Sequence, residues 1–387
     1  MPAMRRIYLD NAATSWPKPE SVYAAVDAYQ RQCGAAAGRG AYGSAQQAAQ
    51  LVQRARTGVA TLLGGIDPRR IAWTLNATDA LNQAIHGWVG PGQHVVTTDI
   101  EHNSVLRPLH ALSTDRAVSV DYAPCDKTGL VSIDALRAAL RPNTRLLVVN
   151  HASNVTGALQ PLESIAELAR ERRVPLLVDV AQTLGQIPWS LPFDQPLLVA
   201  GAGHKSLLGP LGVGFLAMSD DVAEQLRPQR QGGTGTQSED ESQPTSLPDR
   251  FESGNLNVPG LAGLASGIDE ILARGVASIA THHAQLAATL RESLAAIPGV
   301  QVLGPTLAEQ SVGVVSITSD EYEPQDLSAI LDTSFGIETR AGLHCAPRIH
   351  RRLGTLARGG TLRFSVGFAT TADDIAAAAN AVGESCP

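Results

Sequence analysis

The sequence predicts an α/β protein, with a large unit built on a mostly parallel sheet and a smaller α+β unit after it. Between residues 95 and 218, short apolar runs alternate with amphipathic segments. This alternation is typical of buried parallel strands covered by helices on both faces. The length of 387 residues favours two packed units. With 44% hydrophobic and 17% charged residues, the chain can bury sizeable cores.

The large unit is predicted to begin with helices and to continue with alternating strands and helices. Two early segments have helical periodicity, AQQAAQLVQRARTGVATLLGG and NATDALNQAIHGWVG. The strands that follow are predicted at VVTTD, RLLVVNH, VPLLVDV, QPLLVAG and GVGFLAM. A helix near residues 106–112 and another at LESIAELARERR separate some of these strands. These elements indicate one doubly covered sheet.

Residues 229–257 are rich in Gly, Ser, Thr, Gln and Pro and predict a long loop, of a length that is usually functional. Beyond it, residues 259–298 have helical spacing, VGVVSITSD and TLRFSVGF resemble strands, and DDIAAAANAV resembles a closing helix. We therefore expect a large domain at 18–258, and a small domain formed by 1–17 together with 259–387.

Several classes of function are disfavoured by composition. The formal net charge of −7 leaves no basic surface for nucleic acid, and no apolar run is long enough to span a bilayer. Asp10 and Asn11 fall where a secretory signal would need a continuous apolar stretch, so a cytoplasmic location is expected. The four cysteines have no CxxC spacing, so neither disulfides nor a metal site are expected.

The segments LLVDVAQTLGQ and LLVAGAGHKSLLGPLGVGF carry the main chemical signal. Asp179 closes one apolar run, Gln182 follows it, and Lys205 follows a second run in a Gly-His-Lys turn. Taken singly, such an Asp is more often a turn former or helix cap. Together they fit a pyridoxal phosphate site, where a lysine forms an imine with the aldehyde and an acid keeps the pyridine nitrogen protonated. Gln182 would then bond to the phenolic oxygen of the ring.

The chain resembles the class V aminotransferase-like, fold-type-I pyridoxal phosphate enzymes, in particular the cysteine desulfurase and selenocysteine lyase branch. The resemblance covers nearly the whole chain, through YLDNAATSWPKPE, EHNSVLRP, NHASNVTGALQP, VDVAQTLGQ, GHKSLLGPLGVG, FESGNLN, RAGLHCAP and TLRFSVG, in family order. Each motif is short, but their joint order is specific.

The resemblance implies roles for further residues. His102 would stack on the cofactor ring and relay protons, although a helix cap is its ordinary interpretation. Thr78 and His204 would bind the phosphate, Thr78 at a helix N-terminus. Asn154 would face cofactor and substrate. Arg363 would hold the substrate carboxylate as a bidentate partner, with Arg340 also on the substrate side.

Two departures from the family pattern concern the phosphate. Ala202 stands where the family commonly has serine, in Ala-Gly-His-Lys, so one hydroxyl donor is missing. Asn255 stands where threonine is frequent, in the segment that the family's neighbouring subunit contributes. The Asn255 amide would still donate to phosphate, and the resemblance implies a homodimer.

Cys345 distinguishes between branches of the family. It follows Arg340 and His344 in RAGLHCAP, and a cationic setting favours a reactive thiolate. A small inert hydrophobe is the ordinary interpretation of a cysteine. The pattern, however, resembles the second group of sulfur-mobilising desulfurases, which have a short cysteine loop. The resemblance thus implies catalysis by Lys205, Cys345 and His102, with persulfide formed on Cys345 and passed to an acceptor protein, as in iron–sulfur cluster assembly.

Four hypotheses follow. The first is a desulfurase that converts L-cysteine to L-alanine. The second is a selenocysteine lyase, or another class V aminotransferase-like lyase, since the weaker carbon–selenium bond of L-selenocysteine can break without a protein thiol. The third is a nucleotide-binding oxidoreductase, which no GxGxxG after the first strand supports. The fourth, a non-catalytic sulfur-relay scaffold, conflicts with the intact set of Lys205, Asp179, His102 and Cys345.

Overall fold

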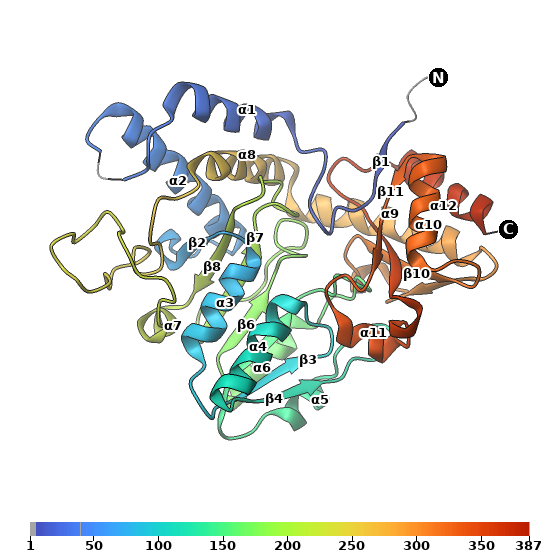
Figure 1. The fold of residues 1–387 in the computed structure, drawn as a ribbon, viewed down its shortest axis with the longest axis horizontal. Coiled ribbons are helices and arrows are strands. Elements are labelled where there is room, and N and C mark those ends of the chain that lie inside the picture. Colours follow the sequence, from blue (N-terminus) through green and yellow to red (C-terminus); the bar gives the residue numbers. More distant parts are fainter. Residues whose placement is uncertain (1–4, 39, 387) are drawn as a thin grey trace.

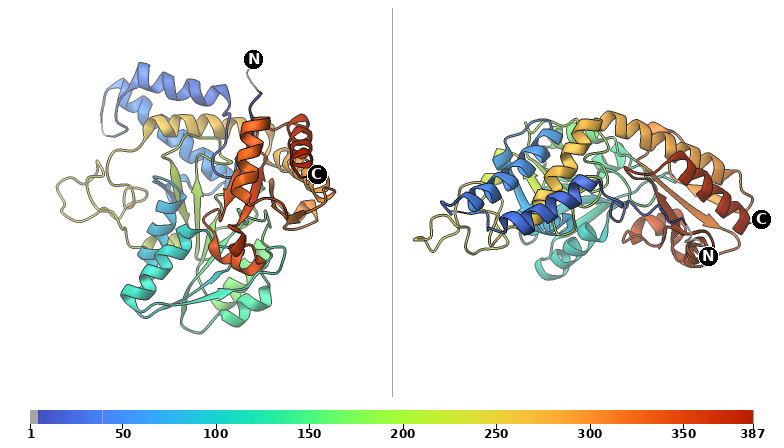
Figure 2. Two further views of the ribbon diagram at one scale, coloured as in Figure 1. Left: turned by 45° about the vertical axis from the view of Figure 1, so that its right-hand side comes forward. Right: turned by 90° about the horizontal axis from the view of Figure 1, so that it is seen from above.

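The computed structural model describes residues 5–38 and 40–386 and shows two packed units (Figure 1). Residues 1–4 and 387 of the predicted small domain lie outside the described residues. Seen from above, the C-terminal helices and strands, in orange and red, lie beside the larger unit (Figure 2). The predicted combination of a large α/β unit and a smaller α+β unit is confirmed.

The large unit is organised around a seven-stranded sheet in the order β2-β8-β7-β6-β5-β3-β4. Neighbours from β7 to β4 are parallel, and β8 is antiparallel to both β2 and β7, as predicted for a mostly parallel sheet. The strands are β2 (Ile71–Thr74), β3 (His94–Thr98), β4 (Ser119–Ala123), β5 (Thr144–Asn150), β6 (Leu176–Asp179), β7 (Leu197–Ala202) and β8 (Gly214–Met218).

Helices cover both faces of this sheet, because the strands are apolar on both sides. One face packs against α3 (Ala77–Trp88), α4 (Asn103–Arg116) and α7 (Asp220–Gln225). The other packs against α2 (Gly43–Leu62), α5 (Ile133–Ala139), α6 (Leu162–Arg172) and α8 (Val258–Arg274). Helix α1 (Glu20–Ala28) and the π-helical turn Tyr29–Cys33 lie against α8.

The small unit contains a four-stranded antiparallel sheet in the order β12-β13-β10-β9. Its strands are β9 (Val300–Leu303), β10 (Val314–Ser319), β12 (Arg340–Gly342) and β13 (Thr361–Ser365), and β1 (Ile7–Tyr8) pairs in parallel with β11 (Ile337–Glu338) nearby. Its helices are α9 (Val276–Ala295), α10 (Pro324–Phe335) and α12 (Ala372–Ser385). Helix α11 (Pro347–Leu353) follows β12 in the chain, but its Ile349 packs into the core of the large unit. Short 3-10 turns occupy Pro68–Arg70, Ala308–Gln310 and Leu356–Arg358.

Helix α8 begins at the boundary predicted between residues 258 and 259, and its buried face packs with the large unit. The buried face of α8, including Leu261, Leu264 and Ile268, belongs to the core of the large unit. The core of the small unit takes its helical residues from α9 onward, beginning with Leu286. Helical periodicity predicts that α8 has an apolar face, but the same face would fit either unit.

The predicted long loop is confirmed, since no helix or strand lies between Gln225 and Val258. In Figure 1 this segment extends from the side of the large unit away from the small one. No helix within the described ranges is sufficiently long and apolar to cross a bilayer.

Candidate active site

The carboxyl ends of β5, β6 and β7 form the base of the site. Asn150 and Asp179 are paired at the ends of β5 and β6, and Ala200 of β7 lies opposite Asp179. Ligands of parallel α/β sheets bind outside this edge, because the loops that follow the strands converge there. The Gly-His-Lys turn follows β7 directly and places Lys205 at the same edge.

Lys205 lines the cavity at this edge and is partly buried. Burial lowers the pKa of its amine to about 8, while the Asp179 carboxylate acts in the opposite direction. Lys205 is therefore neutral in a fraction of the protein molecules near physiological pH. A neutral amine is the form that attacks an aldehyde or accepts a proton.

Asp179 is a buried carboxylate whose described hydrogen bond comes from a backbone group. Its Oδ1 accepts from the Ala181 N–H at 2.9 Å, and the side chain lines the cavity. Burial raises the pKa of Asp179, opposed by the Ala181 N–H and the Lys205 charge. A buried carboxylate is costly without a charged partner. A cationic ring nitrogen in the cavity would supply that partner.

His102 both caps a helix and lines the cavity. It is the N-cap of α4, where its Nδ1 accepts from the Ser104 N–H at 3.1 Å. This bond fixes the neutral tautomer with the proton on Nε2. Burial, followed by the nearby Lys205 charge, lowers the pKa of His102 to about 4. The helix-cap interpretation is therefore correct, and the ring still lines the cavity as a neutral imidazole.

The N-terminus of α3 forms another wall of the cavity. Asn76 caps this helix through its Oδ1, which accepts from the Asp79 N–H at 2.9 Å, and Thr78 donates to or accepts from Ser104 Oγ at 2.7 Å. Gly214 allows the close approach of β8, because a Cβ there would lie 2.4 Å from the Asn76 carbonyl carbon. The positive end of the helix dipole and its free N–H groups suit a phosphate.

His204 also lines the cavity and has an unsatisfied ring nitrogen. Its Nδ1 is buried without a hydrogen-bond partner among the described residues. Burial, with smaller contributions from Lys205 and Lys18, lowers the pKa of His204 to about 4. The neutral ring therefore offers one N–H donor. Ala202 lines the cavity beside it and supplies no hydroxyl.

Gln182 and Asn154 are both buried and both tied to other segments. Gln182 Nε2 donates to the Ala12 carbonyl at 3.0 Å, and Asn154 Nδ2 donates to the His344 carbonyl at 2.8 Å. Each amide nitrogen keeps a second hydrogen. Asn154 Oδ1 is buried and unpartnered in the described structure.

Arg363 is held from two sides in the core of the site. Its Nη2 donates to Asp10 Oδ1 at 2.6 Å and its Nη1 donates to the Asn154 carbonyl at 3.1 Å. Only 2% of the side chain is exposed, and Nε is buried without a partner among the described residues. Arg340 lies directly opposite Arg363 on β12 and also lines the cavity. Two adjacent guanidinium groups and one carboxylate leave a net positive charge for an anionic substrate group.

Cys345 is exposed and lies on a constrained loop. His344 and Cys345 both have left-handed backbone angles, with φ of 47° and 58°. Two hydrogen bonds hold this strained turn, from Asn154 Nδ2 to the His344 carbonyl and from the Asn103 N–H to the Cys345 carbonyl at 2.6 Å. The thiol is thereby fixed at the mouth of the cavity.

The expectation that His344 adds positive charge beside the thiol is wrong. His344 is buried and its Nε2 donates to the Thr361 carbonyl at 3.1 Å. Burial, reinforced by the Arg363 charge, lowers the pKa of His344 to about 2, so the ring is neutral. Arg340 is the cation that remains from the predicted pair.

The structure brings nearly all of the predicted residues to one cavity of about 290 Å³. These residues are Thr78, His102, Asn154, Asp179, Gln182, His204, Lys205, Arg340, Cys345 and Arg363. Asn255 does not line it and instead contributes to a separate groove with Leu75 and Gly212.

The residues present fit pyridoxal phosphate. His204 and the start of α3 would hold the phosphate, Asp179 the ring nitrogen, Gln182 the phenolic oxygen, and Lys205 the aldehyde carbon. The buried unpartnered atoms His204 Nδ1 and Asn154 Oδ1 lie in residues that line the same cavity. Unsatisfied buried polar atoms are rare unless a bound molecule completes them.

Asp10 and Ser104 form hydrogen bonds with predicted site residues, and the sequence pattern assigns them no such role. Asp10 lies in LDNAAT, where its carboxylate could have suggested a partner for a buried arginine, but 353 residues separate it from Arg363. Ser104 follows His102 in EHNSV and joins His102 to Thr78. The sequence pattern around Ser104 is typical of the start of a helix, and this pattern alone does not predict a contact with Thr78.

Asp179→Ala is expected to weaken cofactor binding and to reduce turnover by about a hundredfold or more. The physical reason is that the cavity then lacks the carboxylate that would pair with a protonated ring nitrogen. Dissociation of pyridoxal phosphate, followed by absorbance, and steady-state turnover measure the two effects. Asp194→Ala is the control, because Asp194 is an exposed carboxylate that does not line the cavity. Near-normal activity of Asp179→Ala would show that another group performs this role.

Comparisons with known proteins agree with this geometry. Residues 7–377 match the family model for class-V aminotransferases. A protein from Methanothermobacter thermautotrophicus described as a probable cysteine desulfurase is 33% identical over 97% of this chain and 94% of its own length. A probable cysteine desulfurase from Vibrio cholerae is 30% identical over 95% of this chain and 91% of its own.

Solved structures give the same result for the fold. The apo structure of cysteine desulfurase from Thermococcus onnurineus NA1 has a TM-score of 0.91 and 28% identity, covering 98% of this chain and 94% of that one. The cysteine desulfurase CsdA from Escherichia coli has a TM-score of 0.87 and 27% identity, with the same coverage.

Proposed function

The chain belongs to the class-V aminotransferase family, among its cysteine desulfurases, and from this premise we propose that it converts L-cysteine to L-alanine and retains the sulfur as a persulfide on Cys345. The observation that carries the proposal is that Cys345, Lys205 and the Arg340–Arg363 pair line one cavity. A desulfurase needs a thiol, an amine and a group that binds the substrate carboxylate, all within reach of one substrate molecule.

Pyridoxal phosphate, when bound, supplies an electron-accepting ring that stabilises negative charge on the carbon skeleton of the substrate. Arg363 and Arg340 bind the substrate carboxylate and fix its direction relative to the amine. Lys205, with a pKa of about 8, exchanges a proton between its Nζ and the substrate carbon. His102 presents its Nε2–H to the cavity as a neutral donor.

The sulfur transfer balances with the thiol of this chain alone. Cys345 Sγ, as thiolate, forms a bond to the substrate sulfur while the substrate Cβ–S bond breaks. The electron pair of that bond stays with the carbon skeleton, which takes up a proton and leaves as alanine. Cys345 then carries the persulfide, and no external oxidant is consumed.

The activity is tested by incubating the cofactor-loaded protein with L-cysteine and measuring alanine and sulfide, with and without a thiol reductant. Alanine formation is expected in both conditions, and sulfide is expected to increase with reductant because reductant releases the persulfide. Formation of pyruvate and ammonia instead of alanine would contradict the proposal.

We further propose that the active form is a homodimer whose partner completes each site. Support comes from Asn255, which lies outside the cavity of its own chain in a groove with Leu75. Leu75, which lines this groove, and Leu211, next to Gly212 of the groove, are 58% and 67% exposed, so apolar surface is available there for a partner. Asn255 of one chain would reach the phosphate of the other.

This arrangement predicts a sedimentation mass of two chains at assay concentrations and complementation between two defective variants. Lys205→Ala mixed with Asn255→Asp, whose added charge repels phosphate, should regain activity through mixed dimers with one intact site. The Lys205→Ala and Asp179→Ala pair is the control and should not recover, because both changes fall in the same chain's site. A fully active monomer would refute the dimer.

The exposed Cys345 also suits a protein acceptor that takes the persulfide by direct contact. A free catalytic thiol works in a reducing compartment, which supports a cytoplasmic location. Transfer of labelled sulfur from Cys345 to an added acceptor protein would test the proposed protein acceptor.

A further inference from the structure

The carbonyl oxygen of His204, next to the amide of Lys205, is the centre of a dense set of hydrogen bonds. Thr14 Oγ1 donates to it at 3.0 Å, the Ser15 N–H at 3.0 Å, Ser15 Oγ at 3.2 Å and Lys18 Nζ at 3.3 Å. A carbonyl oxygen has two lone pairs, so four donors exceed the usual number. All four come from residues 14–18, which we call the N-terminal clamp.

Lys18 is the charged member of the clamp, and its bonding capacity is fully used. Its ammonium has three donors, and they meet three oxygens: Ser15 O at 3.1 Å, Ser15 Oγ at 2.9 Å and His204 O. Because Ser15 Oγ accepts from Lys18, its own proton remains free for His204 O. No carboxylate forms an ion pair with Lys18 within residues 5–38 and 40–386.

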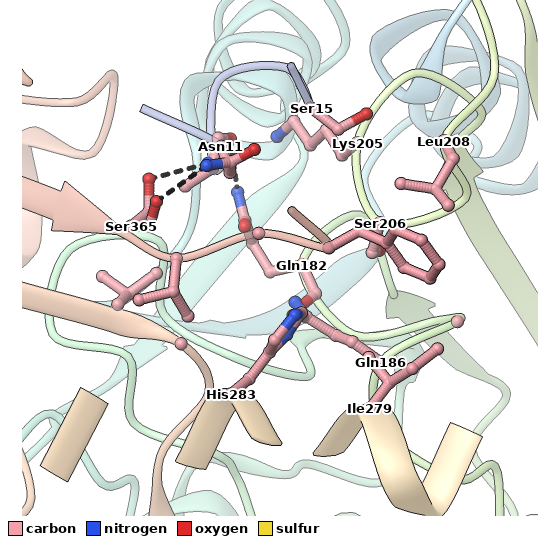
Figure 3. Close-up of a pocket in the computed structure, with 17 residues that line it drawn as sticks. Asn11, Ser15, Gln182, Gln186, Lys205, Ser206, Leu208, Ile279, His283 and Ser365 are labelled. Atoms are coloured by element: carbon pink, nitrogen blue, oxygen red, sulfur yellow. Dashed lines mark hydrogen bonds between the residues drawn. The ribbon is translucent and has the colours of Figure 1, made fainter. Parts of the chain in front are cut away.

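The clamp connects the two units of the molecule. Before it, β1 pairs with β11 of the small unit and Asp10 forms a bridge with Ser365. After it, α1 packs on α8 of the large unit. Ser15 and Lys205 line the same small cavity between the units, of about 30 Å³, together with Gln182 and His283 (Figure 3). The clamp is thus the direct contact between the N-terminal segment and the lysine turn.

We propose that Lys18 is a positioning residue for the cofactor lysine: its ammonium, through Ser15 and the His204 carbonyl, fixes the His204–Lys205 peptide so that His204 and Lys205 face the cavity together. The role rests on the proposed function, because it assigns His204 to phosphate and Lys205 to the aldehyde. Burial lowers the pKa of the Lys18 amine to about 8. Although this pKa resembles that of Lys205, all three donors of the Lys18 ammonium are occupied by hydrogen bonds to Ser15 and His204, so Lys18 has a structural role.

The test is Lys18→Met in the full chain, because methionine keeps a long apolar stem and removes all three donors. Hydrogen exchange is followed by mass spectrometry in peptides covering 203–209, with and without bound pyridoxal phosphate. Exchange there is expected to be roughly tenfold faster than in the unaltered protein, as a charge-assisted bond is lost. Peptides of α12 should not change, because none of the described hydrogen bonds joins this helix to residues 14–18.

Pyridoxal phosphate affinity, measured by absorbance, is expected to fall by roughly tenfold in Lys18→Met and to recover in part in Lys18→Arg, which retains a charged donor. Lys127→Met, at an exposed turn, is the matched control and should match the unaltered protein. If Lys18→Met does not fold, Ser15→Ala tests the same carbonyl by removing one donor to His204 and one acceptor from Lys18.

Unaltered exchange at 203–209 and unaltered cofactor affinity in Lys18→Met, or in Ser15→Ala if it replaces it, would overturn the proposal. Equal acceleration of exchange in α12 and in 203–209 would also overturn it, because that result indicates general destabilisation. Absence of alanine formation by the unaltered protein, with cofactor bound normally, would refute the desulfurase activity and leave the clamp standing.

Discussion

Lys205→Ala is expected to abolish covalent attachment of pyridoxal phosphate and to lower turnover by about a thousandfold or more. Lys205 is the amine that lines the cavity beside Asp179, and its pKa of about 8 leaves it partly neutral. Borohydride treatment of the loaded protein, followed by peptide mass spectrometry, should find the cofactor fixed to Lys205. The Lys205→Ala variant should carry none.

The other two lysines are internal controls for this experiment. Lys127 is exposed at a turn, and Lys18 has a similarly lowered pKa but three occupied donors. The pKa alone therefore does not distinguish Lys18 from Lys205, whereas the geometry does. Cofactor found on Lys18 or Lys127 in the unaltered protein would contradict the assignment.

Cys345→Ala is expected to keep the absorbance of bound cofactor and to lose sulfur transfer from L-cysteine by at least about a hundredfold. The thiol is not one of the groups that would hold the ring, and it lies on the exposed loop after β12. Cofactor absorbance and alanine formation are therefore measured on the same sample. Cys33→Ala, at a partly buried cysteine of the large unit, is the matched control.

Unaltered alanine and sulfide release by Cys345→Ala would contradict the assignment of the nucleophile. A variant that still released selenium from L-selenocysteine while failing on L-cysteine would agree with it, since the weaker carbon–selenium bond can break without a protein thiol.

The acid and the lysine of the site could be predicted because the sequence shows where buried strands end. Asp179 and Lys205 each follow an apolar run of a parallel sheet, and parallel strands bring their carboxyl ends to one edge. The ordered motifs of the resemblance then located the remaining residues, which the structure gathers in one cavity.

Long-range pairing could not be predicted in the same way. Asp10 and Arg363 are neighbours only because Asp10 forms a bridge beside β13, and no local pattern encodes that contact. The neutrality of His344 depends on its burial and on Arg363, whereas its sequence neighbours suggested a cation. The unit to which α8 belongs depends on which neighbour covers its apolar face.

The most direct test of the central claim is mass spectrometry of the cofactor-loaded protein after exposure to L-cysteine without reductant. Cys345 is the exposed cysteine at the cavity, whereas Cys125 and Cys386 are buried. We predict one added sulfur atom on the peptide containing Cys345 and none on the peptides of Cys33, Cys125 or Cys386. Alanine released with no sulfur added to Cys345, or sulfur added to one of the other three cysteines instead, would contradict it.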